Sequence, residues 1–290
     1  MGVITKAVGA SWLMPALGLG QETLASQPSY TVGQIMEMIL KTIPGAPFSK
    51  TVDTLKSGNA AQKVTGIVST MFATVDVIKK AIASGANFII AHEPTFYNHA
   101  DETDWLNNDD VFQYKHDLLT KHNIALWRFH DYIHAHRPDG VQTGVLAALG
   151  WTNYASADNA HVLTLPATAL GQLVTHAKSK LDIKMVRVIG DPAQSCQRIL
   201  LMPGASGGRS QIAAIEKEKP DVIFCGETSE WETPEYVRDA RQQGKKLSLV
   251  ILGHIMSEAA GMNWVVSWLK PQLPGLKITY IPSGNAFTYL

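Results

Sequence analysis

The chain has 290 residues, 46% of them hydrophobic, and a formal net charge of zero at pH 7. A chain of this length and apolar content can bury a full core. It holds no long basic tract, which argues against a nucleic-acid surface. Its only cysteines, Cys196 and Cys225, exclude a disulfide framework and a cysteine-rich zinc site.

Residues 1–27 differ in composition from the rest of the chain. They contain one lysine, an apolar stretch from Ala7 to Gly20, and then small and polar residues. This layout is typical of a secretory signal peptide with a weak basic region, and it predicts an exported (periplasmic or secreted) protein. The alternative is an amphipathic first helix of a cytoplasmic protein. The stretch is short for a membrane span, and we expect no membrane contact in the mature form.

From Tyr30 onward, helical and extended patterns alternate. A helix capped by Thr31 is predicted through about Lys41. A charged, glycine-containing stretch follows. The elements predicted next are a strand at 64–71, a helix at 73–84, a strand at 88–91, a helix at 109–122, a strand at 123–129 and a helix at 140–151.

The second half repeats this alternation after a less legible segment, residues 152–197, with a predicted strand at 161–165 and helix at 167–180. Its predicted strands cover 198–204, 221–226, 246–253 and 276–282, and its helices 208–219, 233–244 and 255–270. Alternating strands and helices predict an α/β fold with a layered, mainly parallel sheet.

Segments of the two halves, about residues 30–150 and 195–290, resemble each other. "GANFIIAHEP" corresponds to "KPDVIFCGET", which pairs Glu93 with Glu227. "IALWRFHDYIHA" corresponds to "LSLVILGHIMSEA", which pairs His130 with His254 and His134 with Glu258. The matching order indicates an internal duplication, although short α/β segments can also be alike by chance.

Histidine and glutamate side chains follow three of the predicted strands. In open α/β sheets, sites gather at the carboxyl ends of strands, and residues four apart share one face of a helix. Imidazoles and carboxylates without cysteine suit Zn, Fe, Mn, Co or Ni, and suit Ca poorly. A metal site is therefore predicted from these residues: His92 and Glu93; His130, Asp131, His134 and His136; His254 and Glu258.

Each piece also has an ordinary structural interpretation. His254 and Glu258 taken alone are typical of a solvated helix face, and "HDYIHAH" could form a polar loop. The hypothesis rests on all pieces lying at equivalent strand ends. The remaining histidines are predicted to be structural: His99, His116, His122, His161 and His176.

The stretches "IIAHEP", "HDYIHAHRPDGV", "DVIFCGETSE" and "GHIMSE" also occur in this order in a known family. From about Tyr30 to Leu290 the chain resembles the dinuclear-metal-centre hexameric proteins related to the NGG-interacting factor, often described as type 2 GTP cyclohydrolase I homologues. The resemblance implies one dinuclear-metal-centre domain, residues 28–290, built from two similar, intertwined α/β halves in α/β/α layers with a mixed sheet. It also implies two divalent metal ions and a homohexameric ring.

The ligand positions of that family match this chain only in part. The family has two adjacent histidines where this chain has His92 and Glu93, and an aspartate where it has His134. The family's final histidine and glutamate match His254 and Glu258. The resemblance therefore implies a site in which one imidazole and one carboxylate have exchanged places, with three histidines and two carboxylates in total.

The leading hypothesis for function is a two-metal hydrolase that activates water toward a small phosphorylated or nucleotide-like substrate. Glu258 is the predicted bridging ligand, and His130 or Glu227 would move the proton. A glycine-rich turn could bind phosphate through backbone N–H groups, or be a tight turn without a ligand. Its glycines are Gly204, Gly207 and Gly208. The alternative function is a non-catalytic hexameric metal-binding scaffold or metal-handling protein.

Overall fold

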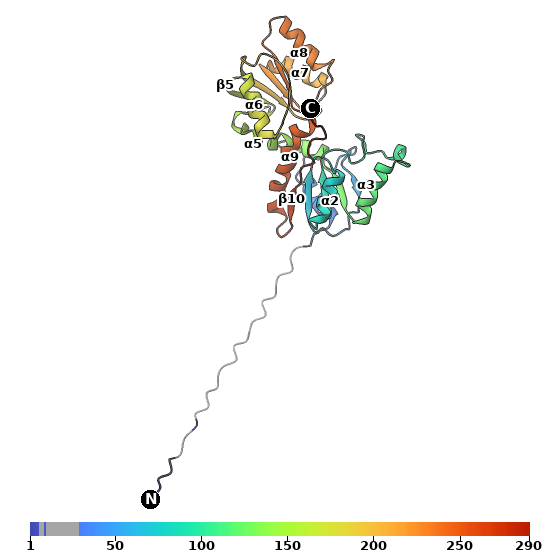
Figure 1. Ribbon diagram of the computed structural model, residues 1–290, viewed down its shortest axis with the longest axis vertical. Helices are drawn as coiled ribbons and strands as arrows, with labels where there is room; N and C mark the ends of the chain where they lie inside the picture. Colours follow the sequence, from blue (N-terminus) through green and yellow to red (C-terminus); the bar gives the residue numbers. More distant parts are fainter. Residues whose placement is uncertain (6–8, 10–28) are drawn as a thin grey trace.

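The computed structural model describes residues 1–5, 9 and 29–290 (Figure 1). Most of the signal-like segment, residues 1–27, lies outside the described residues. Among the helices that are described, none combines the length and the apolar character required to cross a membrane. The folded part begins with helix α1 (Val32–Leu40), which Thr31 caps together with Gln34 as the sequence predicts.

The first five-stranded sheet has the order β1-β4-β3-β2-β10. Its centre is formed by three parallel, fully buried strands, β2 (Ile67–Thr70), β3 (Phe88–Ala91) and β4 (Ala125–Arg128). Their apolar runs are typical of strands that are covered on both faces. At the edges, β1 (Leu55–Ser57) pairs antiparallel with β4, and β10 (Ile278–Tyr280) pairs parallel with β2.

The second five-stranded sheet has the order β5-β7-β8-β9-β6. Strands β7 (Ser195–Met202), β8 (Val222–Cys225) and β9 (Ser248–Ile251) run parallel in its centre. Strands β5 (Val162–Ala169) and β6 (Arg187–Ile189) pair antiparallel at the two edges.

The two sheets have the same construction. Read from one edge, β1-β4-β3-β2-β10 corresponds to β6-β9-β8-β7-β5, with an antiparallel strand beside β4 or β9 in each. Only the opposite edges differ, because β10 is parallel to β2 whereas β5 is antiparallel to β7. Strand β10 comes from the C-terminal part of the chain yet completes the first sheet, so the halves are intertwined. The predicted α/β fold with mixed sheets is confirmed.

Helices cover both sheets. Helix α9 begins between the two sheets and runs along the first of them (Figure 1). The α-helices besides α1 are α2 (Val75–Ala83), α3 (Asp110–Lys121), α4 (Asp131–Ala135), α5 (Gly140–Leu149), α6 (Leu170–Leu181), α7 (Gly208–Glu218), α8 (Thr233–Gln242) and α9 (His254–Leu269). Short 3-10 helices cover Asp104–Leu106, Thr152–Tyr154 and Lys270–Gln272.

Helices α5 and α9 touch through their backbones. A Cβ atom on Gly144 would lie 2.5 Å from the carbonyl oxygen of Ala260, and one on Gly261 would lie 2.6 Å from Cα of Val141. Both positions therefore need glycine for this close approach. Since α5 follows α4 and α9 carries Glu258, the contact sets how closely α4 and α9 approach each other.

Gly144→Ala is expected to destabilise the protein by about 1–3 kcal/mol, because the added methyl group overpacks the α5–α9 contact. Alanine favours helices over glycine, which offsets part of this loss. Gly171→Ala in α6 is the control, because its Cβ would come no nearer than 3.4 Å to Pro192. Urea unfolding of both variants checks the prediction, and equal midpoints for the two would contradict it.

Candidate metal centre

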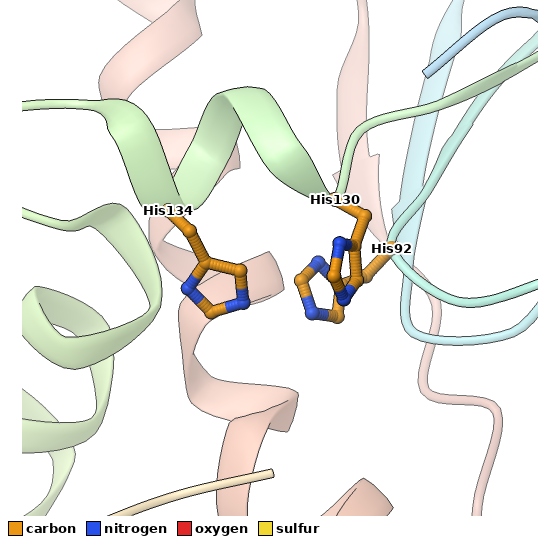
Figure 2. Close-up of side chains that lie close together, drawn as sticks. All are labelled: His92, His130 and His134. Atoms are coloured by element: carbon orange, nitrogen blue, oxygen red, sulfur yellow. The ribbon is translucent and has the colours of Figure 1, made fainter. Parts of the chain in front are cut away.

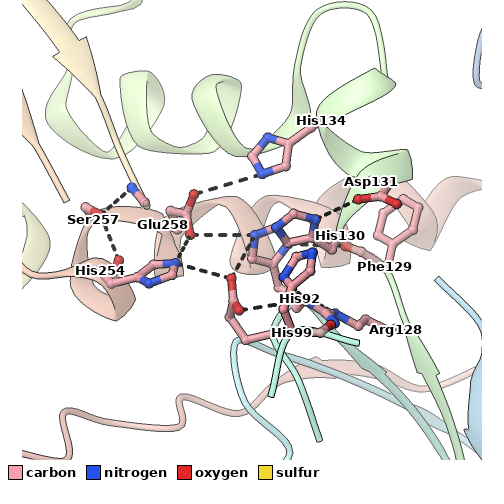
Figure 3. Close-up of polar contacts among 12 residues, drawn as sticks. His92, His99, Arg128, Phe129, His130, Asp131, His134, His254, Ser257 and Glu258 are labelled. Carbon is pink, nitrogen blue, oxygen red and sulfur yellow. Dashed lines mark hydrogen bonds and ion pairs between the residues drawn. The ribbon is translucent and has the colours of Figure 1, made fainter. Parts of the chain in front are cut away.

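Six histidine and glutamate side chains converge at one place. Figure 2 shows His92, His130 and His134, and Figure 3 adds His254 and Glu258. The six side chains come from the carboxyl ends of β3 and β4, from α4, and from the first turns of α9, which follows β9. In chain order they are His92, Glu93, His130, His134, His254 and Glu258. The structure thus brings together the five side chains of the implied ligand set and adds His130.

Glu258 lies at the centre of the cluster and is only 3% exposed. Its Oε2 lies 3.1 Å from Nε2 of His254 and 3.6 Å from Nε2 of His92. Its Oε1 lies 4.0 Å from Nε2 of His134. The second carboxylate, Glu93, has Oε1 3.2 Å from Nε2 of His254 and 3.7 Å from Nε2 of His92. Two buried carboxylates therefore share two imidazoles.

His92 and His134 are oriented by hydrogen bonds from outside the cluster. Nδ1 of His92 donates to the carbonyl oxygen of Phe129 at 3.2 Å, and Nδ1 of His134 donates to Asp139 at 2.9 Å. Each bond leaves Nε2 directed at Glu258 (Figure 3). Metal-ligating histidines are usually held in this way, with the other ring nitrogen bound to a carbonyl or carboxylate.

His130 and His254 have the same kind of support. Nδ1 of His130 donates to Asp131 at 2.9 Å, and Nδ1 of His254 lies 3.4 Å from the carboxylate of Glu227. Asp131 also accepts bonds from Thr51 and from the backbone of Val52. Asp131 therefore orients the ring of His130 and is not itself a ligand in this cluster. Glu227 has the matching position next to His254.

Two buried atoms of the cluster have no hydrogen-bond partner. They are Nε2 of His92 and Oε2 of Glu258, which face each other at 3.6 Å without a hydrogen bond between them; among the described residues, the only charged neighbour of Oε2 closer than this is His254, at 3.1 Å. An unpaired buried polar atom costs about 1–3 kcal/mol, so such atoms call for an explanation. Ring nitrogens of His92, His130 and His134 lie within 4.8 Å of one another, and so do donor atoms of His92, Glu93 and Glu258. The residues present fit a divalent metal ion.

The carboxylates and histidines also shift one another's pKa values. Burial opposes the charged form of His254, but its hydrogen bonds with Glu258 and Glu93 outweigh burial and raise its pKa to about 10. Burial likewise raises the pKa of Glu258, but bonds with His254 and His92 hold it well below its usual value. Burial and the neighbouring His92 lower the pKa of His130 to about 4. His130 is therefore neutral at pH 7, as a proton acceptor must be, whereas His254 holds a proton that a bound metal ion would displace.

A cavity of about 400 Å³ opens onto the cluster. Its walls include cluster members together with Pro203, Ala205 and Ser206 of the glycine-rich turn. His99 and His161, which the sequence predicts to be structural, also line it. Neither follows a strand end, and no spacing in the sequence marks them.

The glycine-rich turn after β7 approaches the cluster at Gly204. Gly204 has φ of +70°, and a Cβ atom there would overlap the carboxylate of Glu258. Gly207 has open space around it, whereas a Cβ on Gly208 would lie 2.5 Å from Cβ of Glu232. The structure therefore places Gly204 against the cluster and Gly208 against an acidic side chain.

His136 lies outside the cluster, although the sequence groups it with His130 and His134. Its Nδ1 donates to the carbonyl oxygen of Pro138, and its ring packs edge-on against Trp264 and Trp268. "HDYIHAH" is not a polar loop, because Asp131–Ala135 form helix α4.

The chain is similar to proteins that are already known. The family model described as Duf34/NIF3 (NGG1p interacting factor 3) matches residues 30–285. A Clostridium perfringens protein named GTP cyclohydrolase 1 type 2 homolog is 25% identical over 243 residues, which cover 80% of this chain and 87% of that protein.

Two solved structures show the same fold. A Staphylococcus aureus hypothetical protein has a TM-score of 0.72 at 18% identity, covering 90% of this chain and 99% of its own. A Bacillus cereus protein related to NIF3 has a TM-score of 0.71 at 15% identity, covering 92% and 99%.

Proposed function

Because the chain belongs to the Duf34/NIF3 family, we propose that its cluster binds two divalent metal ions and hydrolyses a phosphorylated or nucleotide-like small molecule. The name of the Clostridium perfringens relative, GTP cyclohydrolase 1 type 2 homolog, supports a nucleotide-like substrate. The proposed ligands are His92, Glu93, His134, His254 and Glu258.

The observation that carries this proposal is that Nε2 of His92 and Oε2 of Glu258, both buried, face each other at 3.6 Å without a hydrogen bond between them, since Nδ1 of His92 is already bonded to Phe129. His92 belongs both to a group with two further histidines and to a group with two carboxylates. Because one imidazole nitrogen binds a single ion, the ligand shared between two neighbouring ions must be a carboxylate. Glu258, with one oxygen toward His134 and the other toward His92 and His254, is suited to bridge them.

Divalent ions bound in this cluster would supply Lewis acidity and activate a water molecule for hydrolysis. The protein's own part is to orient the ligands and to move protons. His130 is neutral at pH 7, lines the cavity and is oriented by Asp131, so it can accept a proton there. Glu227 contacts Nδ1 of His254 and is assigned the orientation of that ring.

The cavity favours hydrolysis over the alternative of a non-catalytic metal-binding scaffold. Structural metal sites are closed by protein ligands, whereas catalytic sites keep access for water and substrate. Here a space of about 400 Å³ reaches Glu93, His254 and Glu258. Metal analysis of the purified protein, followed by a screen of phosphate esters and nucleotides with the metal found, tests the proposal. Metal binding without turnover of any compound would favour the scaffold. The homohexamer and export remain predictions.

Gly204→Ala is expected to weaken metal binding about 10–100-fold, the range typical for disturbed ligand support, because its methyl group would displace the Glu258 carboxylate. Gly207→Ala is the matched control: it has a similar φ of +77° but open space for the methyl group. Titration of both variants with zinc against a competing chelator gives the comparison. Equal zinc affinities would show that Gly204 does not support Glu258.

A further inference from the structure

A second cavity, of about 490 Å³, lies next to the first. The two share Glu93, His99 and His254, so the second cavity also borders the candidate metal centre. The rest of its lining is largely apolar or aromatic and includes Phe72, Val75, Pro94 and Tyr97. It also contains Lys115 of α3, a charged side chain that the proposed hydrolysis does not use.

Within the described part of the chain, Lys115 is a buried cation with few polar partners and no carboxylate beside it. The residue is 6% exposed, and its Nζ donates to the carbonyl oxygen of Thr95 at 2.6 Å. Nζ lies 5.5 Å from the centroid of the Tyr97 ring and 5.8 Å from that of Phe96. Within residues 29–290, no carboxylate lies within 4.0 Å of it. An ammonium group has three N–H donors, so Lys115 retains capacity for an anion.

The nearby acidic group is already engaged elsewhere. Oδ1 of Asp101 accepts the backbone N–H groups of Thr95 and Phe96, and Oδ2 lies 3.3 Å from Nζ of Lys56. Burial lowers the pKa of Lys115 to about 8, although the charge of Asp101 raises it. The side chain is therefore mainly charged at pH 7, and an anion beside it would favour the charged form further.

Thr95 also lines this cavity and holds a second unsatisfied group. The residue is 1% exposed, and its Oγ1 has no hydrogen-bond partner. The loop that carries it is held in an unusual conformation, since Tyr97 and Asp101 have φ of +64° and +59° without being glycine. Such conformations persist only where the surrounding structure imposes them, and they are frequent at ligand sites. The loop is thus preorganised around Thr95 and Lys115.

We propose that this cavity binds an organic anion, with its carboxylate or phosphate on Lys115 and Thr95 and its aromatic or apolar body between Phe72 and Tyr97. Bound there, the other end of the molecule lies toward Glu93 and His254. As an assignment of substrate class, the inference rests on the proposed function, because it takes the cavity as the substrate pocket of the metal centre.

The test uses the full chain, after chelator treatment and again after zinc loading, with calorimetric titration of three probes. Phenyl phosphate and benzoate carry the two kinds of anion on the same ring, and benzyl alcohol is the neutral control. Lys115→Met is expected to weaken binding of the preferred anion about 10–100-fold, as for a hydrogen bond to a charged group, and to leave benzyl alcohol unchanged. Lys121→Met, on the exposed side of α3, is the matched control and should behave as wild type.

Thr95→Val, an isosteric change, is a second variant in case Lys115→Met unfolds, and should weaken anion binding about 3–10-fold. Whichever of phenyl phosphate and benzoate the wild type binds more tightly shows whether the cavity prefers a phosphate or a carboxylate. The inference is overturned if the chelated wild type binds neither anion, or if Lys115→Met and Thr95→Val bind them as tightly as wild type. Anion binding through Lys115 in a protein that takes up no metal would support the pocket and contradict the hydrolase.

Discussion

Glu258→Gln is expected to abolish tight metal binding. The loss of affinity should exceed the roughly 10–100-fold that is typical for groups which only support a ligand. The amide keeps the size of the side chain but removes the negative charge that faces three imidazoles, those of His92, His134 and His254. Metal content after dialysis, and zinc affinity against a competing chelator, measure the effect.

The same substitution should also destabilise the metal-free protein. Glu258 is buried but the side chain of its partner His254 is 22% exposed, so the loss should fall below the roughly 3–5 kcal/mol typical when one partner of a fully buried ion pair is removed. Glu37→Gln is the control, because Glu37 is an exposed carboxylate on α1 paired with Lys41. A Glu258→Gln variant that retains wild-type zinc affinity would contradict its assignment as a ligand.

The second large effect concerns the exchanged positions, Glu93 and His134. Glu93→His is expected to give weaker metal loading, because it replaces an anion by a neutral or cationic ring next to His92 and His254. It also removes the carboxylate whose Oε2 lies 3.9 Å from the buried guanidinium of Arg128. Glu93→Ala removes the same anion and should likewise weaken binding.

Addition of His134→Asp to Glu93→His restores three histidines and two carboxylates, and should recover metal loading relative to the single variant. The recovery will be incomplete, because Asp139 now bonds to Nδ1 of His134 and would repel a carboxylate at that position. The metal content of Glu93→Ala, Glu93→His and the double variant tests whether Glu93 and His134 are the exchanged ligands. If Glu93→Ala and Glu93→His both load like wild type, the exchanged-ligand interpretation fails.

The central strands were predictable because they are continuous apolar runs. The prediction for β3, residues 88–91, matches the structure residue for residue, and Pro94 follows it as a stop. Strands β1 and β6 were missed. Each has three residues, neither is fully buried, and each exists only by antiparallel pairing with a strand distant in sequence. Local propensity carries little information about such edges.

The candidate site was likewise predictable from sequence only in part. Strand ends and the four-residue spacing of His254 and Glu258 were sufficient to find the cluster, since these signals are local. Lys115 was not found, because a lysine on an amphipathic helix usually faces solvent. Its burial depends on the loop with left-handed Tyr97 and Asp101, and that backbone conformation is rare for residues other than glycine.

Anomalous diffraction from crystals grown with zinc tests the central claim most directly. We expect two peaks per chain within the cluster, with both sharing Glu258 and with Nε2 of His92 and of His254 at about 2.0–2.1 Å from an ion. A single peak held only by His92, His130 and His134, or zinc bound elsewhere with none in the cluster, would contradict the two-ion centre.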